Sequence, residues 1–184
     1  MDSPFMRYMA DAISQQGVRV GRFNFPYMER AVEEGRRRPP DAMKKLLVAW
    51  EEVARNVARS LKEGQRLAIG GKSMGGRIAS MSTQLEGVGA LICLGYPFHP
   101  PGKPEKLRTD HLADIKVPAV IIQGERDTFG NKEEVKKMHL ARRIKKVWLP
   151  DGDHSFKPRK LSGRTLEQNL DLAVEKLLAF LSAC

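Results

Sequence analysis

Short apolar runs alternate along this chain with longer segments in which apolar residues recur every three or four positions. The runs predict buried strands, because a strand covered on both faces needs apolar side chains throughout. These predicted strands are 67–69, 88–94, 117–123 and 144–149. The segments after them predict helices at 74–85, 132–140 and 165–181. Such alternation predicts a mainly parallel sheet between two layers of helices, which is a three-layer α/β fold.

The N-terminal part of the chain predicts a helix followed by a strand. Ser3 suits a helix N-cap, Pro4 suits the first helical position and Gly17 suits the end. Residues 18–25 alternate imperfectly between apolar and polar side chains. They therefore predict a partly buried strand closed by Pro26.

A long amphipathic helix is predicted after a stretch rich in arginine and proline. That stretch, residues 26–40, predicts an exposed loop. Asp41 then predicts the N-cap of the helix, and Gly64 its end. The apolar positions of this helix recur every three or four residues: Leu46, Leu47, Trp50, Val53, Ala54, Val57 and Leu61.

A serine among small residues follows the first of the four apolar runs. Gly71, Lys72, Ser73, Met74 and Gly75 spell G-x-S-x-G, the pattern that places a serine on a tight strand-to-helix turn with its hydroxyl exposed. Side chains at the two flanking glycines are expected to clash in so sharp a turn. The motif and its setting predict a nucleophilic serine.

Two other interpretations of this motif compete. G-K-S also ends a phosphate-binding P-loop, which needs another glycine five positions before the Gly-Lys pair. Arg66 holds that position and residues 67–69 belong to a strand, which disfavours nucleotide binding. The second alternative is that the glycines only allow close packing and that Ser73 caps the helix.

Two partners for Ser73 follow later strands. Asp127 comes after the strand that ends at Gln123, and His154 comes after 144–149. Functional groups of open α/β sheets gather at the carboxyl ends of strands, and the order Ser, Asp, His is that of α/β-hydrolases. The alternatives are a local turn role for Asp127 and a surface position for His154. Other carboxylates near the site are Glu125, Asp151 and Asp153.

Each of the three residue types has a role in acyl transfer. A serine hydroxyl needs a neighbouring base to take its proton as it attacks. Histidine as a residue type can take and return a proton near neutral pH, so His154 suits this role, while Asp127 would orient it and stabilise the imidazolium. The backbone N–H of Met74 is the expected first oxyanion donor.

Other residues near the predicted site are weaker candidates. Tyr96 and His99 lie in the loop after 88–94, from which they could line a substrate cleft. His111 and His139 are expected to be solvated. Arg77 lies one helical turn after Ser73 and could attract an anionic substrate, although a solvated or ion-paired arginine is the simpler expectation.

Length and charge narrow the function classes. The 184 residues predict one domain, 1–184, which is large enough to fold without disulfides or metals. A net charge of +10 suggests affinity for nucleic acid. The basic residues are nevertheless scattered, with no recognisable nucleic-acid module and few aromatic residues. A solvated basic surface without specific nucleic-acid binding is therefore predicted, and the sequence does not predict an oligomeric state.

Cysteine usage and hydropathy indicate the compartment. Cys93 and Cys184 have neither a disulfide framework nor metal-ligand spacing. No apolar run is long enough to span a bilayer, and the N-terminus has no apolar core typical of a secretory signal. These features predict a cytosolic protein with no membrane partner.

Four segments resemble a known family. They are G-G-K-S-M-G-G-R, L-G-Y-P-F-H-P-P-G-K-P, Q-G-E-R-D-T-F-G and D-G-D-H-S-F-K-P, and together they look like the small, capless, dienelactone-hydrolase-like branch of the α/β-hydrolases. The resemblance implies a Ser73, Asp127, His154 triad that cleaves an ester or thioester of a small acyl substrate, without metal or organic cofactor. The group includes a domain in a histone acetyltransferase complex subunit, so a noncatalytic interaction domain is the alternative.

The start of the chain departs from that family. Its members carry an apolar strand and an H-G-x-G-like loop, the source of the second oxyanion donor, ahead of the segment matching M-D-S-P-F-M-R-Y. We expect a truncated or misassigned start, a different pairing of 18–25, or a second chain that fills the gap. Loss of one oxyanion donor costs about a hundredfold or more in rate.

Overall fold

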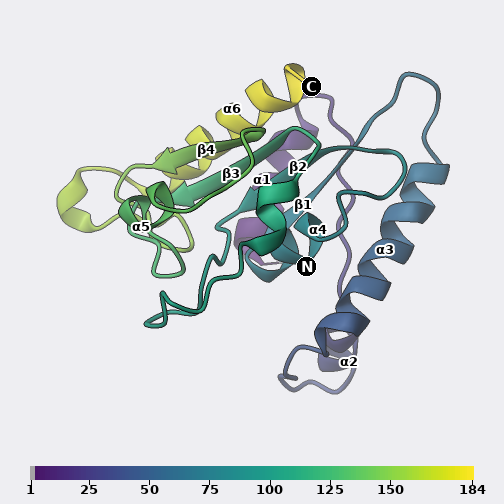
Figure 1. Ribbon diagram of the computed structural model, residues 1–184, viewed down its shortest axis with the longest axis horizontal. Helices are drawn as coiled ribbons and strands as arrows, with labels where there is room; N and C mark the ends of the chain where they lie inside the picture. Colours follow the sequence, from purple (N-terminus) through teal and green to yellow (C-terminus); the bar gives the residue numbers. More distant parts are fainter. Residues whose placement is uncertain (1–2) are drawn as a thin grey trace.

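The computed structural model describes residues 3–184 and contains one parallel sheet with helices on both faces (Figure 1). The strands lie side by side in the order in which they occur in the chain: β1 (Leu67–Lys72), β2 (Val88–Leu94), β3 (Ala119–Gly124) and β4 (Ile144–Leu149). The predicted three-layer α/β architecture is confirmed. Two of the predicted strands, 88–94 and 144–149, have the bounds that their apolar runs indicated.

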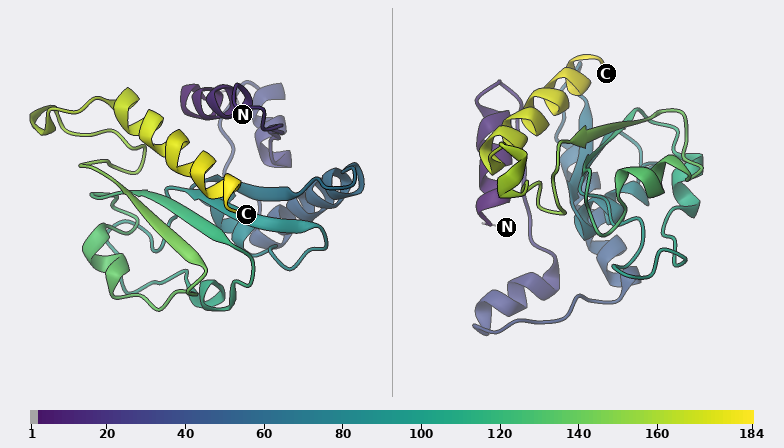
Figure 2. Two further views of the ribbon diagram at one scale, coloured as in Figure 1. Left: turned by 90° about the horizontal axis from the view of Figure 1, so that it is seen from above. Right: turned by 90° about the vertical axis from the view of Figure 1, so that its left-hand side faces the viewer.

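The helices form two layers (Figure 2). One layer consists of α1 (Pro4–Ser14) and α6 (Leu166–Ser182), which contact each other. The opposite layer consists of α3 (Met43–Arg59), α4 (Met74–Ser80), the 3-10 helix η1 (Asp110–Asp114) and α5 (Lys132–Lys136). A separate apolar cluster joins each layer to the sheet.

Strand β3 shows why the central runs are apolar at nearly every position. Val120 and Ile122 belong to the cluster under α1 and α6, whereas Ala119 and Ile121 belong to the cluster under α3 and α4. Because side chains alternate across a strand, a strand covered on both faces has no polar side. All six residues of β3 are buried.

The predicted strand at 18–25 is wrong. The structure leaves this segment without strand pairing, and β1 pairs only with β2 among the described residues. Val18 and Val20 pack in the α1 and α6 cluster, whereas Phe23 and Phe25 pack in the cluster of Trp50 on the other face. The imperfect alternation therefore reflects a segment that passes from one face of the sheet to the other.

The predicted exposed loop at 26–40 is also wrong in part. It contains α2 (Pro26–Glu33), with proline at its start, a position that the fixed φ of proline suits. Asp41 does not cap α3, because its carboxylate pairs with Arg30 at 2.7 Å. The N-cap is Ala42, which makes no side-chain cap hydrogen bond.

The remaining helix predictions hold with smaller differences. Ser3 caps α1 by accepting a hydrogen bond from the Met6 N–H, and Thr165 forms a capping box with Gln168 at the start of α6. Helices α4 and α5 are shorter than the periodicity indicated, and η2 (Lys160–Ser162) precedes α6.

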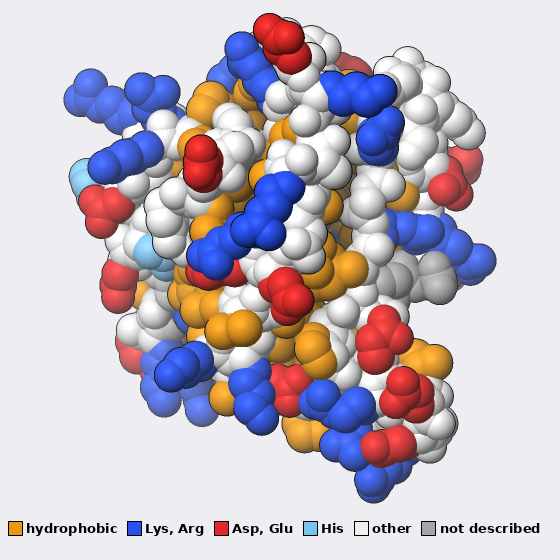
Figure 3. Space-filling view, turned by 90° about the vertical axis from the view of Figure 1, so that its right-hand side faces the viewer, with side chains coloured by type: hydrophobic (Ala, Val, Ile, Leu, Met, Phe, Trp, Pro, Cys, Tyr) orange, Lys and Arg blue, Asp and Glu red, His pale blue; other side chains and the backbone are white. Residues whose placement is uncertain are grey.

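The surface carries mixed charge. On the face in Figure 3, Lys and Arg side chains are interspersed with Asp and Glu, and hydrophobic side chains are visible between them. None of the helices in residues 3–184 has the length and hydropathy needed to cross a membrane.

The packing of α4 against the sheet gives the first prediction. A Cβ atom on Gly76 would lie 2.7 Å from the carbonyl oxygen of Gly71, whereas one on Gly75 would have no neighbour within 4 Å. We expect Gly76→Ala to lower the free energy of unfolding by about 1–3 kcal/mol, the usual effect of overpacking. Gly75→Ala is the matched control and should leave it unchanged or raise it by up to about 1 kcal/mol. Chemical denaturation measures the free energy of unfolding of both variants. An equal change in the two would show that close packing does not require a glycine at position 76.

Candidate active site

Ser73 occupies the single residue between β1 and α4. Its backbone φ of 52° and ψ of −117° lie outside the regions that residues other than glycine normally adopt. The Ser73 N–H donates to the Leu94 carbonyl at 2.9 Å, so pairing with β2 continues up to the serine. The turn therefore holds the serine at the carboxyl end of the sheet.

The two glycines that flank the serine differ in their surroundings. A Cβ on Gly71 would lie 2.9 Å from the carbonyl carbon of Gly75 and 3.0 Å from the Gly76 nitrogen. Gly71 is thus required by the close approach of strand and helix. The expected clash at Gly75 is wrong, since that position faces open space.

The structure brings Ser73, His154 and Asp127 together. Nε2 of His154 lies 2.9 Å from Oγ of Ser73, and Nδ1 lies 2.8 Å from Oδ2 of Asp127. Ser73 makes no side-chain cap bond to α4, so the alternative of a capping serine is excluded. The alternative of a surface histidine also fails, because the ring joins the two other residues.

These contacts determine where the imidazole proton lies. A carboxylate only accepts hydrogen bonds, so Nδ1 of His154 carries the proton that it shares with Asp127. The lone pair of Nε2 is then free to accept the hydroxyl proton of Ser73. This is the arrangement that a general base needs.

Asp127 is completely buried and has further hydrogen-bond donors. Its Oδ2 accepts from Nε2 of Gln123 at 2.8 Å, and its Oδ1 accepts from the Phe129 N–H at 2.8 Å. A buried carboxylate needs such donors, because removal from water disfavours its charge. The predicted turn bond therefore exists beside the contact with His154.

Gln123 is a site residue that the sequence interpretation missed. Its Oε1 accepts from the Tyr96 N–H at 2.7 Å, and its Nε2 lies 3.1 Å from the Tyr96 carbonyl and 3.2 Å from that of Gly130. It thus joins the loops after β2 and β3 beneath Asp127. Its signal was a lone amide in an otherwise apolar strand, since a buried amide needs partners.

Phe129 was also missed. Its ring centroid lies 4.3 Å from that of His154 at an interplanar angle of 34°. The aromatic face limits the rotation of the imidazole, and Phe129 also supplies the backbone donor to Asp127. No sequence pattern marked this residue.

The other carboxylates hold loops instead of the histidine. Glu125 pairs with Lys132 at 2.6 Å, and Asp153 accepts from backbone N–H groups within its own loop. Hydrogen bonds from Arg159 lower the pKa of Asp151 to about 2. Asp127 is therefore the carboxylate that contacts His154.

Tyr96 and His99 do not line a cleft. Tyr96 is completely buried and its hydroxyl donates to the Arg108 carbonyl at 2.9 Å. His99 is 2% exposed, and its ring lies 3.3 Å from the carboxylate of Glu134. Both side chains are buried among protein atoms, so the expectation of substrate contacts is not met.

The remaining candidates lie away from the triad contacts. His111 is half-buried with its Nε2 2.8 Å from the Ser80 hydroxyl, and burial lowers its pKa. His139 is exposed. Arg77 is half-buried, and no hydrogen-bond partner for its Nε is found in residues 3–184. The expectation of a solvated His111 is therefore wrong, whereas Arg77 stays partly exposed to solvent.

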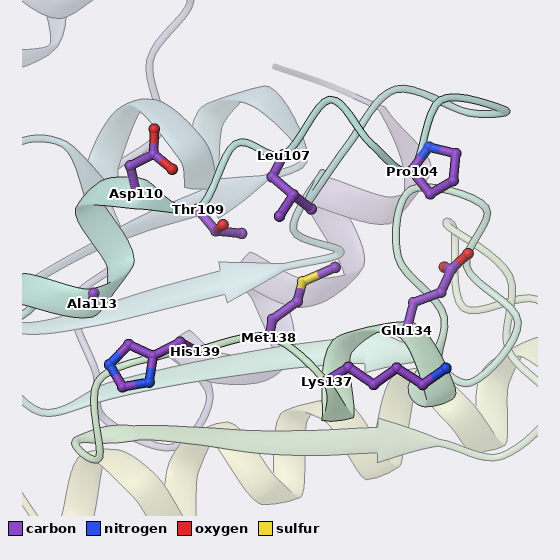
Figure 4. Close-up of a pocket in the computed structure, with 9 residues that line it drawn as sticks. All are labelled: Pro104, Leu107, Thr109, Asp110, Ala113, Glu134, Lys137, Met138 and His139. Carbon is purple, nitrogen blue, oxygen red and sulfur yellow. The ribbon is translucent and has the colours of Figure 1, made fainter.

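No candidate metal centre is found in the described part of the chain, where no three His, Cys, Asp or Glu residues are grouped suitably. A hollow of about 520 Å³ lies between the loop after β2 and α5 (Figure 4). Leu107 and Met138 contribute apolar side chains to it, and Lys137 and Glu134 contribute charge. None of the triad residues lines it.

Comparison with known proteins identifies the family. Residues 1–182 match the profile of the alpha/beta hydrolase domain. The chain belongs to this family. Its assignment to the dienelactone-hydrolase-like branch stays a prediction of the sequence.

Solved structures share the fold of this hydrolase domain. An alpha-beta serine hydrolase homologue from Coxiella burnetii has 21% identity and a TM-score of 0.71, with 96% of this chain and 77% of that chain covered. Est1E from Butyrivibrio proteoclasticus has 15% identity and a TM-score of 0.69, with coverage of 98% and 83%. The esterase domain of a Rhodothermus marinus protein has 16% identity and a TM-score of 0.63, with coverage of 96% and 78%. At these identities the likeness shows the fold.

The position of Gln123 gives the second prediction. Gln123→Leu removes the buried amide, so the Tyr96 N–H loses its acceptor, and the Gly130 carbonyl and Oδ2 of Asp127 each lose a donor. We expect the free energy of unfolding to fall by about 3 kcal/mol, since each buried unsatisfied group costs about 1–3 kcal/mol. Chemical denaturation measures the loss. The exposed Gln16 provides the control. A similar loss of unfolding free energy in Gln16→Leu would contradict the role of Gln123 as a buried hydrogen-bonding residue.

Proposed function

We propose that this protein is a serine hydrolase that cleaves an ester or thioester of a small acyl substrate. The observation that carries the proposal is the continuous hydrogen-bond chain from Ser73 through His154 to Asp127, with distances of 2.9 and 2.8 Å. Such a chain activates a hydroxyl that is otherwise a poor nucleophile.

In the first half of the reaction, the Ser73 oxygen forms a bond to the acyl carbon and its proton moves to Nε2 of His154. The imidazolium is stabilised by the Asp127 carboxylate. Collapse of the tetrahedral intermediate breaks the bond to the leaving alcohol or thiol. That group takes the proton from His154 and leaves an acyl ester on Ser73.

The oxyanion of the intermediate requires hydrogen-bond donors. Met74 is the first residue of α4, and the N–H groups of a first helical turn have no intrahelical acceptor. The Met74 N–H therefore suits the role of first oxyanion donor. Negative charge at this place is also favoured by the helix dipole.

In the second half, a water molecule attacks the acyl ester and gives a proton to His154. Release of the carboxylic acid returns that proton to the Ser73 oxygen. Water is thus the final acyl acceptor, and the described residues handle every proton without an organic cofactor.

The substrate class is proposed as a short or exposed acyl group. Only 24 residues, 95–118, connect β2 to β3, which is too short for a large lid. A structure of Est1E with ferulic acid bound gives an example of a small carboxylic acid on a protein of this fold. We propose a cytosolic protein that acts without specific nucleic-acid or membrane partners.

Labelling with a fluorophosphonate probe tests the proposal. We expect the probe to modify the wild-type protein at Ser73, because the Ser73 oxygen attacks phosphorus and displaces fluoride. Ser73→Ala should abolish labelling, and Ser162→Ala, in the exposed segment before α6, should leave it unchanged. Peptide mass spectrometry locates the label. A folded wild-type protein without labelling would instead favour the noncatalytic interaction domain.

Asp127→Asn gives a second test. The amide has the shape of the carboxylate but favours the wrong imidazole tautomer, and in a comparable triad this change lowered turnover by about ten-thousand-fold. We expect a similarly severe fall in labelling rate, with the labelled residue still Ser73. Circular dichroism checks that the variant is folded. An unchanged rate would remove Asp127 from the mechanism.

A further inference from the structure

Lys72 directly precedes the proposed nucleophile, and its side chain extends to the loop that carries the proposed base. Its Nζ donates a hydrogen bond to the His154 backbone carbonyl at 2.5 Å. Ser73 and His154 are thus joined twice, once through the hydroxyl and the imidazole and once through the neighbouring lysine and the backbone.

The surroundings hold the Lys72 ammonium at this carbonyl. The Phe5 ring centroid lies 5.4 Å from Nζ and the Phe156 ring centroid lies 5.9 Å from it. These two rings contact each other edge to face at 5.2 Å, and aromatic faces attract a cation at such distances. Helix α1 therefore contributes, through Phe5, to the enclosure of a residue beside the triad.

Gly95 closes the remaining side. It has a φ of 63°, and a Cβ at this position would lie 3.0 Å from Nζ of Lys72 and 3.0 Å from the His154 carbonyl oxygen. The end of β2 thus approaches both groups so closely that only glycine fits.

We propose that Lys72 is a positioning residue that holds the His154 loop so that the imidazole stays in line between Ser73 and Asp127. The inference rests on the proposed function, since a positioned imidazole matters for proton transfer. Loss of the lysine leaves the His154 carbonyl without its charged donor, and the loop gains freedom next to the reacting groups.

Burial opposes the positive charge of Lys72. Burial lowers its pKa to about 8, although the carboxylates of Asp127 and Asp153 act in the opposite direction. These two acids reach it from the loops after β3 and β4, whereas Phe5 and Phe156 bring no charge. The pKa of Lys72 is about 8 in the folded protein and 10.5 in its ordinary state. Between these two pH values Lys72 is protonated in the unfolded chain but not in the folded protein, so stability rises with pH. The charged lysine therefore lowers stability at neutral pH.

The test compares Lys72→Met, which keeps the side-chain length and removes the charge, with wild type and with Lys145→Met on the exposed side of β4. We expect the Met variant to be labelled by the fluorophosphonate at least about tenfold more slowly at neutral pH, as small misplacements of catalytic groups cost up to about a hundredfold. Its thermal unfolding temperature should be no lower than that of wild type. Lys145→Met should match the wild-type rate.

The pH profile separates positioning from a general structural effect. Wild-type labelling should decline as pH rises past about 8, where Lys72 loses its proton, and this decline should be absent in Lys72→Met. Equal labelling rates at neutral pH would overturn the proposal. So would a lower unfolding temperature in Lys72→Met, or a decline with the same midpoint in both proteins.

Absence of labelling in the wild type would count against the hydrolase function itself. A proton NMR measurement would still test the positioning role of Lys72 in that case. The hydrogen-bonded Nδ1 proton of His154 should give a downfield resonance in wild type and in Lys145→Met. We expect it to weaken or shift in Lys72→Met. An unchanged resonance would show that Lys72 does not position the ring.

Discussion

The hydrogen bond between His154 and the buried carboxylate of Asp127 is the interaction on which the rest of the site depends. Asp127 is fully removed from water and receives hydrogen bonds from Gln123 and Phe129. Without those donors the carboxylate would be too costly to bury in charged form. The imidazole would then lack the fixed partner that leaves Nε2 facing Ser73.

Close approaches of backbone bring these groups to one edge of the sheet. A Cβ on Gly124 would lie 2.3 Å from the Asp153 carbonyl oxygen, and one on Gly70 would lie 2.2 Å from that of Ile92. The loop of His154 can therefore rest on the end of β3, and β1 can lie against β2. Glycine is needed at these positions because backbone occupies the space that a side chain would take.

The site combines several features that oppose stability. Ser73 has a positive φ, and Lys72 keeps an ammonium group in partly buried surroundings. Strained or desolvated residues persist where the surrounding structure holds them in place. Here the apolar clusters on both faces of the sheet supply the stability that allows these features.

Local patterns in the sequence were sufficient for much of the fold. The apolar runs predicted the strands of the sheet, because burial on both faces of a central strand such as β3 leaves few polar positions. The G-x-S-x-G motif and the order of Asp127 and His154 predicted that these side chains meet Ser73, because strand ends of a parallel sheet meet at one edge. Ser3 predicted a helix start through its own side chain.

Only the tertiary structure decided what depends on contacts between distant segments. Residues 18–25 resemble a strand locally, but their side chains belong to clusters on opposite faces of the sheet. Tyr96 and His99 follow a strand end, yet their loop turns them inward. Gln123 and Lys72 carry no motif for their roles, because each acts through bonds to loops far along the chain. Periodicity reports which residues are buried, whereas the partners of a buried polar group are set by how the loops pack.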